Sequence, residues 1–470
     1  MPTSETSTTV PVSDLRDSVG VRSLAPGEPG YDEARVVGLG GLDPRPALIV
    51  RPTTDEEVAR AVTHARRTGL PLAVRSGGHS GAGHSTADGG IVVDLRDMKR
   101  LDIDPESRTA WAETGLTARE FTEAAAAHGL AVGFGDTGSV GLGGLTLGGG
   151  VGYLARKHGL TIDSLLAADV VTASGEVVRA DAESHPDLFW AVRGGGGNYG
   201  VATRFRFRLH PVDQVVGGML VLPATAETVA GFIAAADAAP DELTTIANVM
   251  NCPPMPFVAD EHHGSIVIMA GLCWAGDLEA GQEAMAPFRA LAEPLADMVG
   301  PRPYPEMFPP DDPSYRPTAV ARTMFLDGVG REGAATIVDR LSASDATLRV
   351  VQLRVLGGAM ARVPTDATAY AHRANRVMAN VAAFYDGPDD RERRLAEVEA
   401  TVAALWQGHT GAYVNFLADE GEERVRAAYP GAHWDRLAAV KATYDPENVF
   451  RRNQNVPPAA ATVPKARQQT

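Results

Sequence analysis

A segment whose residue types could bind phosphate and position a nucleophile lies at residues 75–80, with the sequence Arg-Ser-Gly-Gly-His-Ser. It follows the apolar run Pro71–Val74, which is typical of a buried strand, so we expect a loop at a strand end. Glycine lets a ligand approach the main chain, and free N–H groups in such loops bind phosphate oxygens. Because Gly77 and Gly78 carry no side chains, His79 can project into a bound ligand.

Two glycine clusters strengthen this interpretation. Residues 133–152 contain ten glycines in twenty residues, and Gly194–Gly197 with Gly200 form a second cluster. The alternating stretch Val201–Leu209 that follows predicts a strand. Tight turns alone would account for isolated glycines, but clusters of this density favour a bound polyphosphate cofactor.

One apparent motif is rejected. Gly133–Gly138 matches G-x-G-x-x-G. A dinucleotide fingerprint opens a helix and precedes an acidic residue about 20 positions further on. Here more glycine follows the motif, and positions 155 and 156 are alanine and arginine, so the segment does not indicate a Rossmann unit.

Composition and charge exclude several classes of protein. The 43 basic and 59 acidic residues give a net charge of −16, so nucleic acid and anionic membranes should be repelled, and Arg451–Arg452 is too short a basic patch to reverse this. No run of 18 apolar residues occurs, and Met1–Gly20 lacks a secretory signal pattern. Cys252 and Cys273 fit no metal-ligand spacing. We therefore expect a reduced, cytoplasmic chain with no metal, nucleic-acid or membrane partner; oligomeric state has no sequence signal.

The elements that must position these residues change in character along the chain. Up to residue 212, strand patterns alternate with helical ones, and Thr117 with Glu120 predicts a capping box. After residue 212 the pattern predicts strands and alanine-rich helices near Ala226–Ala238, Leu278–Ala296 and Arg391–Trp406. Seven prolines between residues 301 and 317 predict a long irregular loop, either a functional rim or a surface connector.

Five blocks in order resemble one known family. They are Arg75–His79, Gly135–Leu160, Asp187–Gly200, Tyr413–Phe416 and Tyr444–Asn455. Together they resemble the FAD-linked oxidases of the vanillyl-alcohol-oxidase fold. The nearest branch is berberine-bridge-enzyme-like, with its bacterial hydroxynicotine and antibiotic-tailoring oxidases.

The resemblance implies an α+β fold of two domains. One is a PCMH-type FAD-binding domain, and the other is an inserted substrate domain of antiparallel sheet plus helices. We expect a flexible tail at 1–30, FAD-binding parts at 31–212 and 411–457, the substrate domain at 213–410, and a frayed end at 458–470.

The resemblance also implies that FAD is bonded through its 8-methyl carbon to His79. Many relatives carry a second link from a cysteine in G-x-C-P-T-V-G, but Thr137 stands at that position here, so one covalent link is expected. The other residues that the resemblance assigns to cofactor binding are Arg75, Ser76, Gly77, Gly78, Ser80, Thr137, Gly138, Val140, Gly141, Gly143, Gly144, Gly148, Gly149, Gly150, Gly152, Gly200, Val201, Asn415, Asn453 and Asn455.

Catalysis is assigned by the same resemblance. Tyr413 matches a position implicated as the base in alcohol-oxidising relatives, with a packed strand tyrosine as the alternative. Asn415, two residues on in an expected strand, would share its face and hydrogen-bond the flavin or Tyr413. Tyr370 and His372 are weaker candidates. A neutral amine substrate would need no protein base.

A valine at position 140 is associated in this branch with oxygen access to the flavin. The expected function is therefore an oxidase that transfers hydride to flavin N5 and uses O2, giving H2O2. Its substrate is an alcohol, amine or C–C/C–N centre of a small secondary metabolite. The alternatives are an FAD dehydrogenase with another acceptor, a carbohydrate oxidase, and a flavoprotein that binds ligand without turnover.

Overall fold

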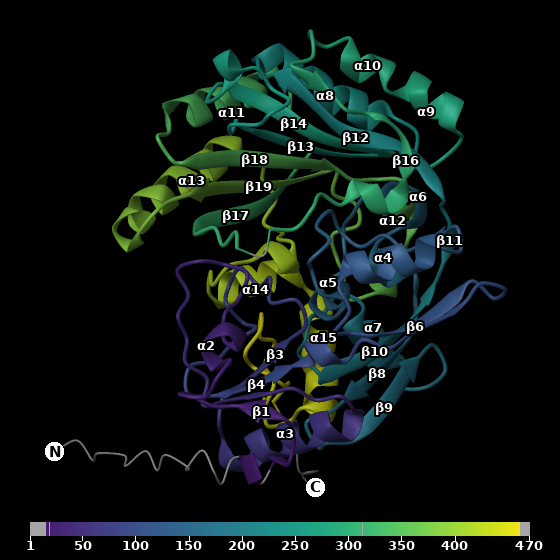
Figure 1. The fold of residues 1–470 in the computed structure, drawn as a ribbon, viewed down its shortest axis with the longest axis vertical. Coiled ribbons are helices and arrows are strands. Elements are labelled where there is room, and N and C mark those ends of the chain that lie inside the picture. Colours follow the sequence, from purple (N-terminus) through teal and green to yellow (C-terminus); the bar gives the residue numbers. More distant parts are fainter. Residues whose placement is uncertain (1–15, 18, 313, 461–470) are drawn as a thin grey trace, which may run out of the picture.

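The computed structural model describes residues 16–17, 19–312 and 314–460 of the chain. Its elements form two lobes (Figure 1). The lower lobe holds the described residues up to 212 together with residues 412–460, and the upper lobe holds the described residues between them. Helices and mainly antiparallel sheets occur together, so the predicted α+β architecture is confirmed.

One sheet of the lower lobe includes residues that the sequence assigned to a flexible tail. β1 (Ser23–Leu24) pairs antiparallel with β2 (Leu48–Val50), and β4 (Ile91–Asp94) and β3 (Leu72–Arg75) continue the sheet in parallel. The tail prediction is therefore wrong for residues 19–30, because Val19 and Val21 are buried in the core beneath this sheet. Residues 1–15, 18 and 461–470 lie outside the described part of the chain.

The second sheet of the lower lobe is antiparallel and surrounds an aromatic core. Its strands, in order, are β5 (Leu101–Asp104), β6 (Thr109–Glu113), β10 (Val201–Arg208), β8 (Leu165–Val171) and β9 (Val177–Asp181). Phe121, Phe134 and Phe207 pack edge to face, with ring centroids 4.9–5.8 Å apart. The predicted capping box of Thr117 and Glu120 is present at the start of α4.

The helices of the lower lobe surround these sheets (Figure 1). The short strands β7 and β11 pair with each other near the lobe junction. These elements are α2 (Tyr31–Ala34), α3 (Asp55–Thr68), α4 (Ala118–Ala126), β7 (Leu130–Ala131), α5 (Leu142–Leu147), α6 (Ala155–His158), α7 (Pro186–Val192), β11 (His210–Pro211), α14 (Glu422–Ala428) and α15 (Ala432–Tyr444).

An eight-stranded antiparallel sheet forms the upper lobe, with helices on its outer face (Figure 1). Its main strands, in order, are β12 (Gln214–Pro223), β14 (Ile266–Trp274), β13 (Leu243–Asn251), β18 (Leu348–Val355), β19 (Val377–Phe384) and β17 (Ala319–Leu326). The short strands β15 (Ala296–Asp297) and β16 (Gly300–Pro303) pair with β12. The helices of the outer face are α8 (Ala226–Ala238), α9 (Leu278–Ala284), α10 (Ala286–Arg289), α11 (Arg331–Ala343) and α13 (Arg391–Leu405). The short helix α12 (Ala359–Arg362) lies on the opposite side of the sheet, against α6 of the lower lobe (Figure 1).

Side chains alternate along β18, and this decides which of them face the lower lobe. Val351 and Leu353 are buried in the core beneath the outer helices. The intervening Gln352 and Arg354 lie on the opposite face, where Arg354 reaches residues of the lower lobe. The face of the sheet opposite the outer helices thus covers the lower lobe, and this eight-stranded sheet is called the roof sheet below.

The helix predicted over Leu278–Ala296 is wrong. The chain instead forms α9, then α10 from Ala286, and then β15. Pro287 lies in the first turn of α10, where its missing N–H costs no hydrogen bond, but a continuous helix would need that donor. The helices predicted near Ala226–Ala238 and Arg391–Trp406 are confirmed.

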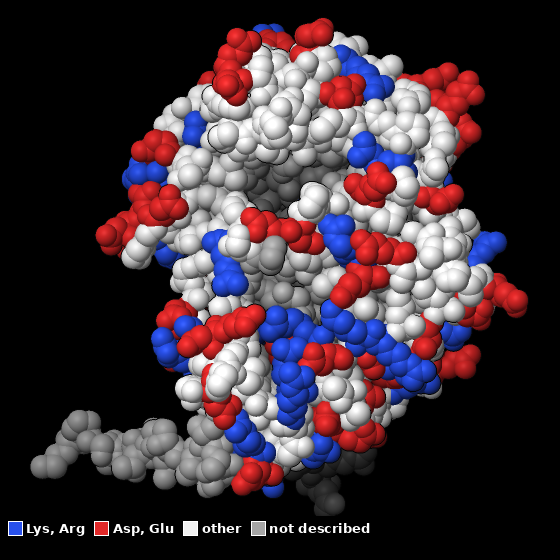
Figure 2. Space-filling model, viewed as in Figure 1, with Lys and Arg blue, Asp and Glu red and all other residues white. Residues whose placement is uncertain are grey.

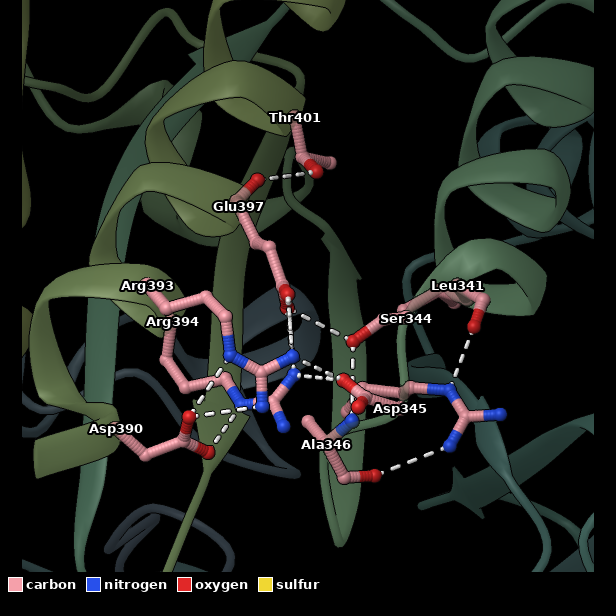
Figure 3. A network of polar contacts seen from close by, with 10 residues as sticks. Leu341, Ser344, Asp345, Ala346, Asp390, Arg393, Arg394, Glu397 and Thr401 are labelled. Carbon is pink, nitrogen blue, oxygen red and sulfur yellow. Dashed lines mark hydrogen bonds and ion pairs between the residues drawn. The ribbon is translucent and has the colours of Figure 1, made fainter.

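A polar network on the outer side of the upper lobe ties α13 to the segment before β18 (Figure 3). The buried Arg394 bonds to Asp345 at 2.6 Å, to Asp390 at 2.9 Å and to Glu397 at 3.0 Å. None of these residues lines the cavity described below. The network therefore stabilises the helix layer of the lobe.

Candidate functional site

A cavity of about 440 Å³ is lined by residues from several separate segments of the lower lobe and by Arg354 of β18. The main lower-lobe segments are β3 with the loop after it, the first glycine cluster, the end of the second cluster with the start of β10, residues 413–417 and residues 450–454; Leu95 also lines the cavity. The molecular surface is hollowed between the two lobes (Figure 2). The fold thus brings the motif-bearing segments to a single place.

Most of the residues assigned to cofactor binding or catalysis line this cavity. They are Ser76, Gly77, Gly78, His79, Ser80, Thr137, Val140, Gly141, Gly143, Gly144, Gly200, Val201, Tyr413, Asn415 and Asn453. The assigned residues that do not line it are Arg75, Gly138, Gly148, Gly149, Gly150, Gly152, Asn455 and Tyr370.

His79 lies on the loop that follows β3 and is exposed to the cavity. Its surroundings lower the pKa of the imidazole, chiefly through desolvation, and a hydrogen bond to the main chain of Ser139 opposes this shift. The ring is therefore neutral near pH 7. A neutral imidazole has the free lone pair that a nucleophile requires.

Arg75 has a different role from the one expected. Its guanidinium is fully buried and donates to the carbonyls of Ser85 and Ala34, away from the cavity. Asp94, at the end of β4, lies 3.8 Å from it. Arg75 therefore holds the loop of His79 against the strands beneath it. It does not line the cavity, so its assignment to the cofactor surface is corrected.

Several glycines are required by close packing between chain segments. A Cβ at Gly148 would lie 2.0 Å from Asn415 Oδ1, and one at Gly150, which has a φ of +77°, would lie 2.1 Å from Thr161 Oγ1. A Cβ at Gly77 would lie 2.2 Å from the main-chain nitrogen of Gly141. By contrast, Gly144 is exposed, lines the cavity and has no atom near its Cβ position.

Tyr413 and Asn415 form the polar part of one cavity wall. The phenolic oxygen of Tyr413 accepts hydrogen bonds of 3.1 Å from the main-chain N–H of Gly150 and of 3.1 Å from Asn415 Nδ2. Asn415 Nδ2 also donates to Leu145 O at 3.1 Å. The strand expected here is wrong, because residues Val414–Phe416 form a 3-10 turn. The predicted contact between the two side chains is nevertheless present.

Opposing effects act on the phenol of Tyr413. Burial raises its pKa, whereas the hydrogen bonds from Asn415 and the glycine segment, and the charge of Arg354, act in the opposite direction. The net direction is upward, so the hydroxyl is protonated at neutral pH. The hydroxyl proton is available to an acceptor in the cavity. After ionisation, the two N–H groups that donate to the phenolic oxygen would stabilise its negative charge.

The two weaker catalytic candidates lie behind this wall. The Tyr370 ring is 6.1 Å from the Tyr413 ring, and its buried hydroxyl has no hydrogen-bond partner among the described residues. Burial raises the pKa of Tyr370. His372 Nε2 is bonded to Ala428 O at 3.1 Å, and burial lowers its pKa to about 4. Neither residue lines the cavity, so both pack behind Tyr413.

Arg354, Asp136 and Phe416 line the cavity but were not found from the sequence. Arg354 bonds to Asp136 Oδ2 at 2.7 Å and to Val151 O at 3.1 Å. Its guanidinium carbon lies 5.1 Å from the centre of the Phe416 ring. An arginine in an alternating strand looks like an ordinary solvent-facing residue, so no local signal identified it.

The residues that line the cavity suit a cofactor that carries a diphosphate. Ser85 Oγ and Asn453 Oδ1 are buried atoms on lining residues, and they have no partner within the described ranges. Glycine-rich loops also line the cavity, and their main-chain N–H groups can bind a diphosphate. Among the described residues, no cluster of histidine, cysteine or acidic side chains could hold a metal ion. Cys252 and Cys273 are free and buried and do not line the cavity.

The part of the chain that the structure covers contains no helix with the length and apolarity to cross a lipid bilayer. This finding concerns residues 16–17, 19–312 and 314–460 alone.

Family comparisons agree with these features. The "FAD binding domain" family matches residues 46–181, and the "Berberine and berberine like" family matches residues 412–457. (R)-6-hydroxynicotine oxidase of Paenarthrobacter nicotinovorans is 31% identical over 93% of this chain and 96% of that protein. Xylooligosaccharide oxidase of Thermothelomyces thermophilus is 29% identical over 88% of each chain.

The fold is also similar to that of a solved flavoprotein. The crystal structure of 6-hydroxy-D-nicotine oxidase from Arthrobacter nicotinovorans matches with a TM-score of 0.84 and 28% identity, covering 96% of this chain and 99% of that one. The similarity therefore extends over both lobes.

Proposed function

This chain belongs to the berberine-like family of FAD-linked oxidoreductases, and we propose that it is an O2-dependent oxidase whose FAD is bonded to the protein through His79 alone. The substrate class proposed is a small metabolite with an alcohol, amine or C–C/C–N centre to be oxidised.

The observation that carries this proposal is the convergence of three distant segments on one cavity. His79 comes from the loop after β3, Thr137 and Val140 come from the first glycine cluster, and Tyr413 comes from the C-terminal part of the chain. A redox cofactor bound here would lie between a neutral imidazole and a buried phenol.

A single attachment is supported by the residues around His79. Thr137 occupies the position where relatives with a second link carry a cysteine, and a hydroxyl side chain offers no thiolate. Burial raises the pKa of Cys273 to about 12, and neither cysteine lines the cavity. The residues that line the cavity thus include histidines but no cysteine, which supports attachment through histidine alone.

When bound, FAD supplies the chemistry of taking a hydride from the substrate and passing two electrons to O2, which gives H2O2. His79 would retain the cofactor, and main-chain N–H groups of the glycine-rich loops would bind its phosphates. Tyr413, when ionised, takes the substrate proton at its phenolic oxygen. Gly150 N–H and Asn415 Nδ2 stabilise the negative charge on that oxygen before the proton arrives.

The names of the relatives indicate how wide the range of substrates is. One oxidase is named for hydroxynicotine and another for xylooligosaccharides. Because these two substrates differ so much, we define the proposed substrate class of this chain by the chemical group that is oxidised.

The experiment is an aerobic H2O2 screen of the purified holoprotein with panels of alkaloids, polyketides and sugars. A substrate that yields H2O2, and whose turnover falls in the Tyr413→Phe variant, supports the proposal. A substrate that bleaches the flavin anaerobically but yields no H2O2 in air contradicts the oxidase assignment and indicates a dehydrogenase.

A further inference from the structure

Arg354 places a positive charge beside the hydrogen-bond network of Tyr413. Arg354 Nη1 donates to the carbonyl of Val151, and the N–H of the preceding residue, Gly150, donates to the Tyr413 phenolic oxygen. The Phe416 ring neighbours both side chains, with its centre 5.1 Å from the guanidinium carbon and 5.0 Å from the centre of the Tyr413 ring. The cation and the phenol thus share one short stretch of main chain and one aromatic neighbour.

The position of Arg354 is set by a chain of hydrogen bonds across the roof sheet. Arg354 Nε donates to Gln352 Oε1 at 2.9 Å, Gln352 Nε2 donates to Asn248 Oδ1 at 2.9 Å, and Asn248 Nδ2 donates to Met269 O at 3.2 Å. Asn248 and Gln352 are direct partners in the pairing of β13 with β18. The upper lobe therefore holds the guanidinium in one orientation.

Asp136 partly neutralises this charge. Its Oδ2 accepts from Arg354 Nη2 at 2.7 Å, and the Asp136 side chain keeps 27% of its surface exposed, whereas that of Arg354 keeps 6%. A buried cation acts strongly on its neighbours because little water screens it. The pair therefore supplies two opposite charges, and either can be removed singly.

We infer that the Arg354–Asp136 pair sets the acidity of the Tyr413 phenol, with Arg354 a positioning residue that stabilises the phenolate and Asp136 a counter-charge that limits this effect. The inference rests on the proposed role of Tyr413 as proton acceptor. It assigns to the upper lobe a direct part in the proton-transfer step, in addition to covering the cavity.

Most other ionisable groups near Tyr413 are neutral or paired. Tyr370 packs on one side of Tyr413, and burial keeps its phenol protonated. Behind Tyr370, the buried Arg373 forms a bidentate ion pair with Asp163, with distances of 2.7 and 2.8 Å. Burial also raises the pKa of Tyr153, which lies in the field of Arg354 and Asp136. The remaining groups are the neutral His372, His79 and His84, and Arg452, a cavity-lining cation that donates to the carbonyl of Thr86.

The test is a direct titration of the phenol in the flavin-loaded protein, labelled with ¹³Cζ-tyrosine. The Tyr413 resonance is assigned by its loss in Tyr413→Phe. Arg354→Met should raise the pKa of Tyr413 by about one unit, and Asp136→Asn should lower it by about as much. Arg354→Lys, which keeps the charge, should lie closer to the wild type than Arg354→Met.

The opposite signs make the result independent of general damage to the fold, because a loosened site would move both variants in the same direction. Equal-direction shifts, or shifts below about 0.3 unit in both variants, would overturn the inference. An Arg354 that serves only to bind a substrate anion would likewise leave the phenol pKa unchanged. No substrate is needed, so a failed H2O2 screen leaves this result interpretable.

Discussion

Asn415 Nδ2 donates a hydrogen bond of 3.1 Å to the phenolic oxygen of Tyr413, although Asn415 lies in a 3-10 turn that begins directly after Tyr413, in place of the expected strand. The same nitrogen bonds to Leu145 O. The amide therefore connects the C-terminal segment to the glycine-rich segment, and its orientation is fixed toward the phenol.

This contact leads to the first prediction, on Tyr413→Phe. The substitution removes the proton acceptor and should slow anaerobic flavin reduction by about 10²–10⁴-fold, as measured by stopped-flow absorbance. Because the phenol is protonated at neutral pH, the wild-type rate should rise about tenfold per pH unit up to the pKa of Tyr413. A variant with the wild-type rate and pH profile would remove Tyr413 from the mechanism.

A second prediction concerns Gly148→Ala. The added Cβ would lie 2.0 Å from Asn415 Oδ1 and 2.4 Å from its Cγ, so the amide must move away from Tyr413. We expect a loss of about 1–3 kcal/mol of stability and slower flavin reduction. Gly144→Ala is the matched control for thermal unfolding, since nothing lies within 4 Å of its Cβ position. Equal melting temperatures for the two variants would contradict the packing argument.

A third prediction concerns a buried ion pair in the C-terminal segment. Lys441 and Asp445 are fully buried, and Lys441 Nζ donates to Asp445 Oδ2 at 2.7 Å and to the carbonyls of Asn198 and Phe450. Lys441→Met leaves an unpaired buried charge and should cost about 3–5 kcal/mol in denaturant unfolding.

Two further variants test that interpretation. The double variant Lys441→Met/Asp445→Asn should be more stable than Lys441→Met, because the uncompensated carboxylate is gone. Arg331→Met, which breaks the exposed ion pair with Glu227, should change stability far less than Lys441→Met does, because solvent screens that pair. A Lys441→Met variant no less stable than Arg331→Met would refute the assignment of this pair as a stabilising contact.

A fourth prediction is a pH dependence of stability. The rings of His158 and His210 stack with centroids 4.1 Å apart, and desolvation lowers their pKa values to about 3 and about 4. The unfolded chain, with histidine pKa values of about 6.5, therefore binds protons more readily than the native protein. This contribution to stability is present above about pH 6.5 and is lost as the pH falls, by at most about 1.4 kcal/mol per unit for each histidine.

Denaturant unfolding between about pH 7 and pH 5 measures that slope. The double variant His158→Gln/His210→Gln should show a shallower fall in unfolding free energy than the wild type over this range. If the two slopes agree, the stacked pair does not titrate as the structure requires.

Features that depend on short-range chemistry could be predicted from the sequence. The capping box of Thr117 and Glu120 depends on residues three positions apart, and the structure contains it. The loop of Arg75–Ser80 follows a strand, as the apolar run before it indicated. The fold class was predicted from five ordered blocks, and similarity to a solved relative over nearly the whole chain agrees with it.

Features that depend on distant contacts could not be predicted. Arg354 reaches Asp136 because β18 pairs with β13 and β19 in one register, and no local pattern encodes that register. Arg75 turns inward because Ser85 and Ala34 present carbonyls to it. The turn at Val414–Phe416 likewise depends on Asn415 meeting the glycine segment, which the local sequence does not reveal.

Intact mass spectrometry of acid-denatured, exhaustively washed protein tests the proposed bond between His79 and the flavin. His84, a second histidine lining the same cavity, provides the matched control. We expect a mass of polypeptide plus one FAD for the wild type and for His84→Ala, and of bare polypeptide for His79→Ala. A bare-polypeptide mass from wild-type protein that held flavin before denaturation would refute the bond to His79.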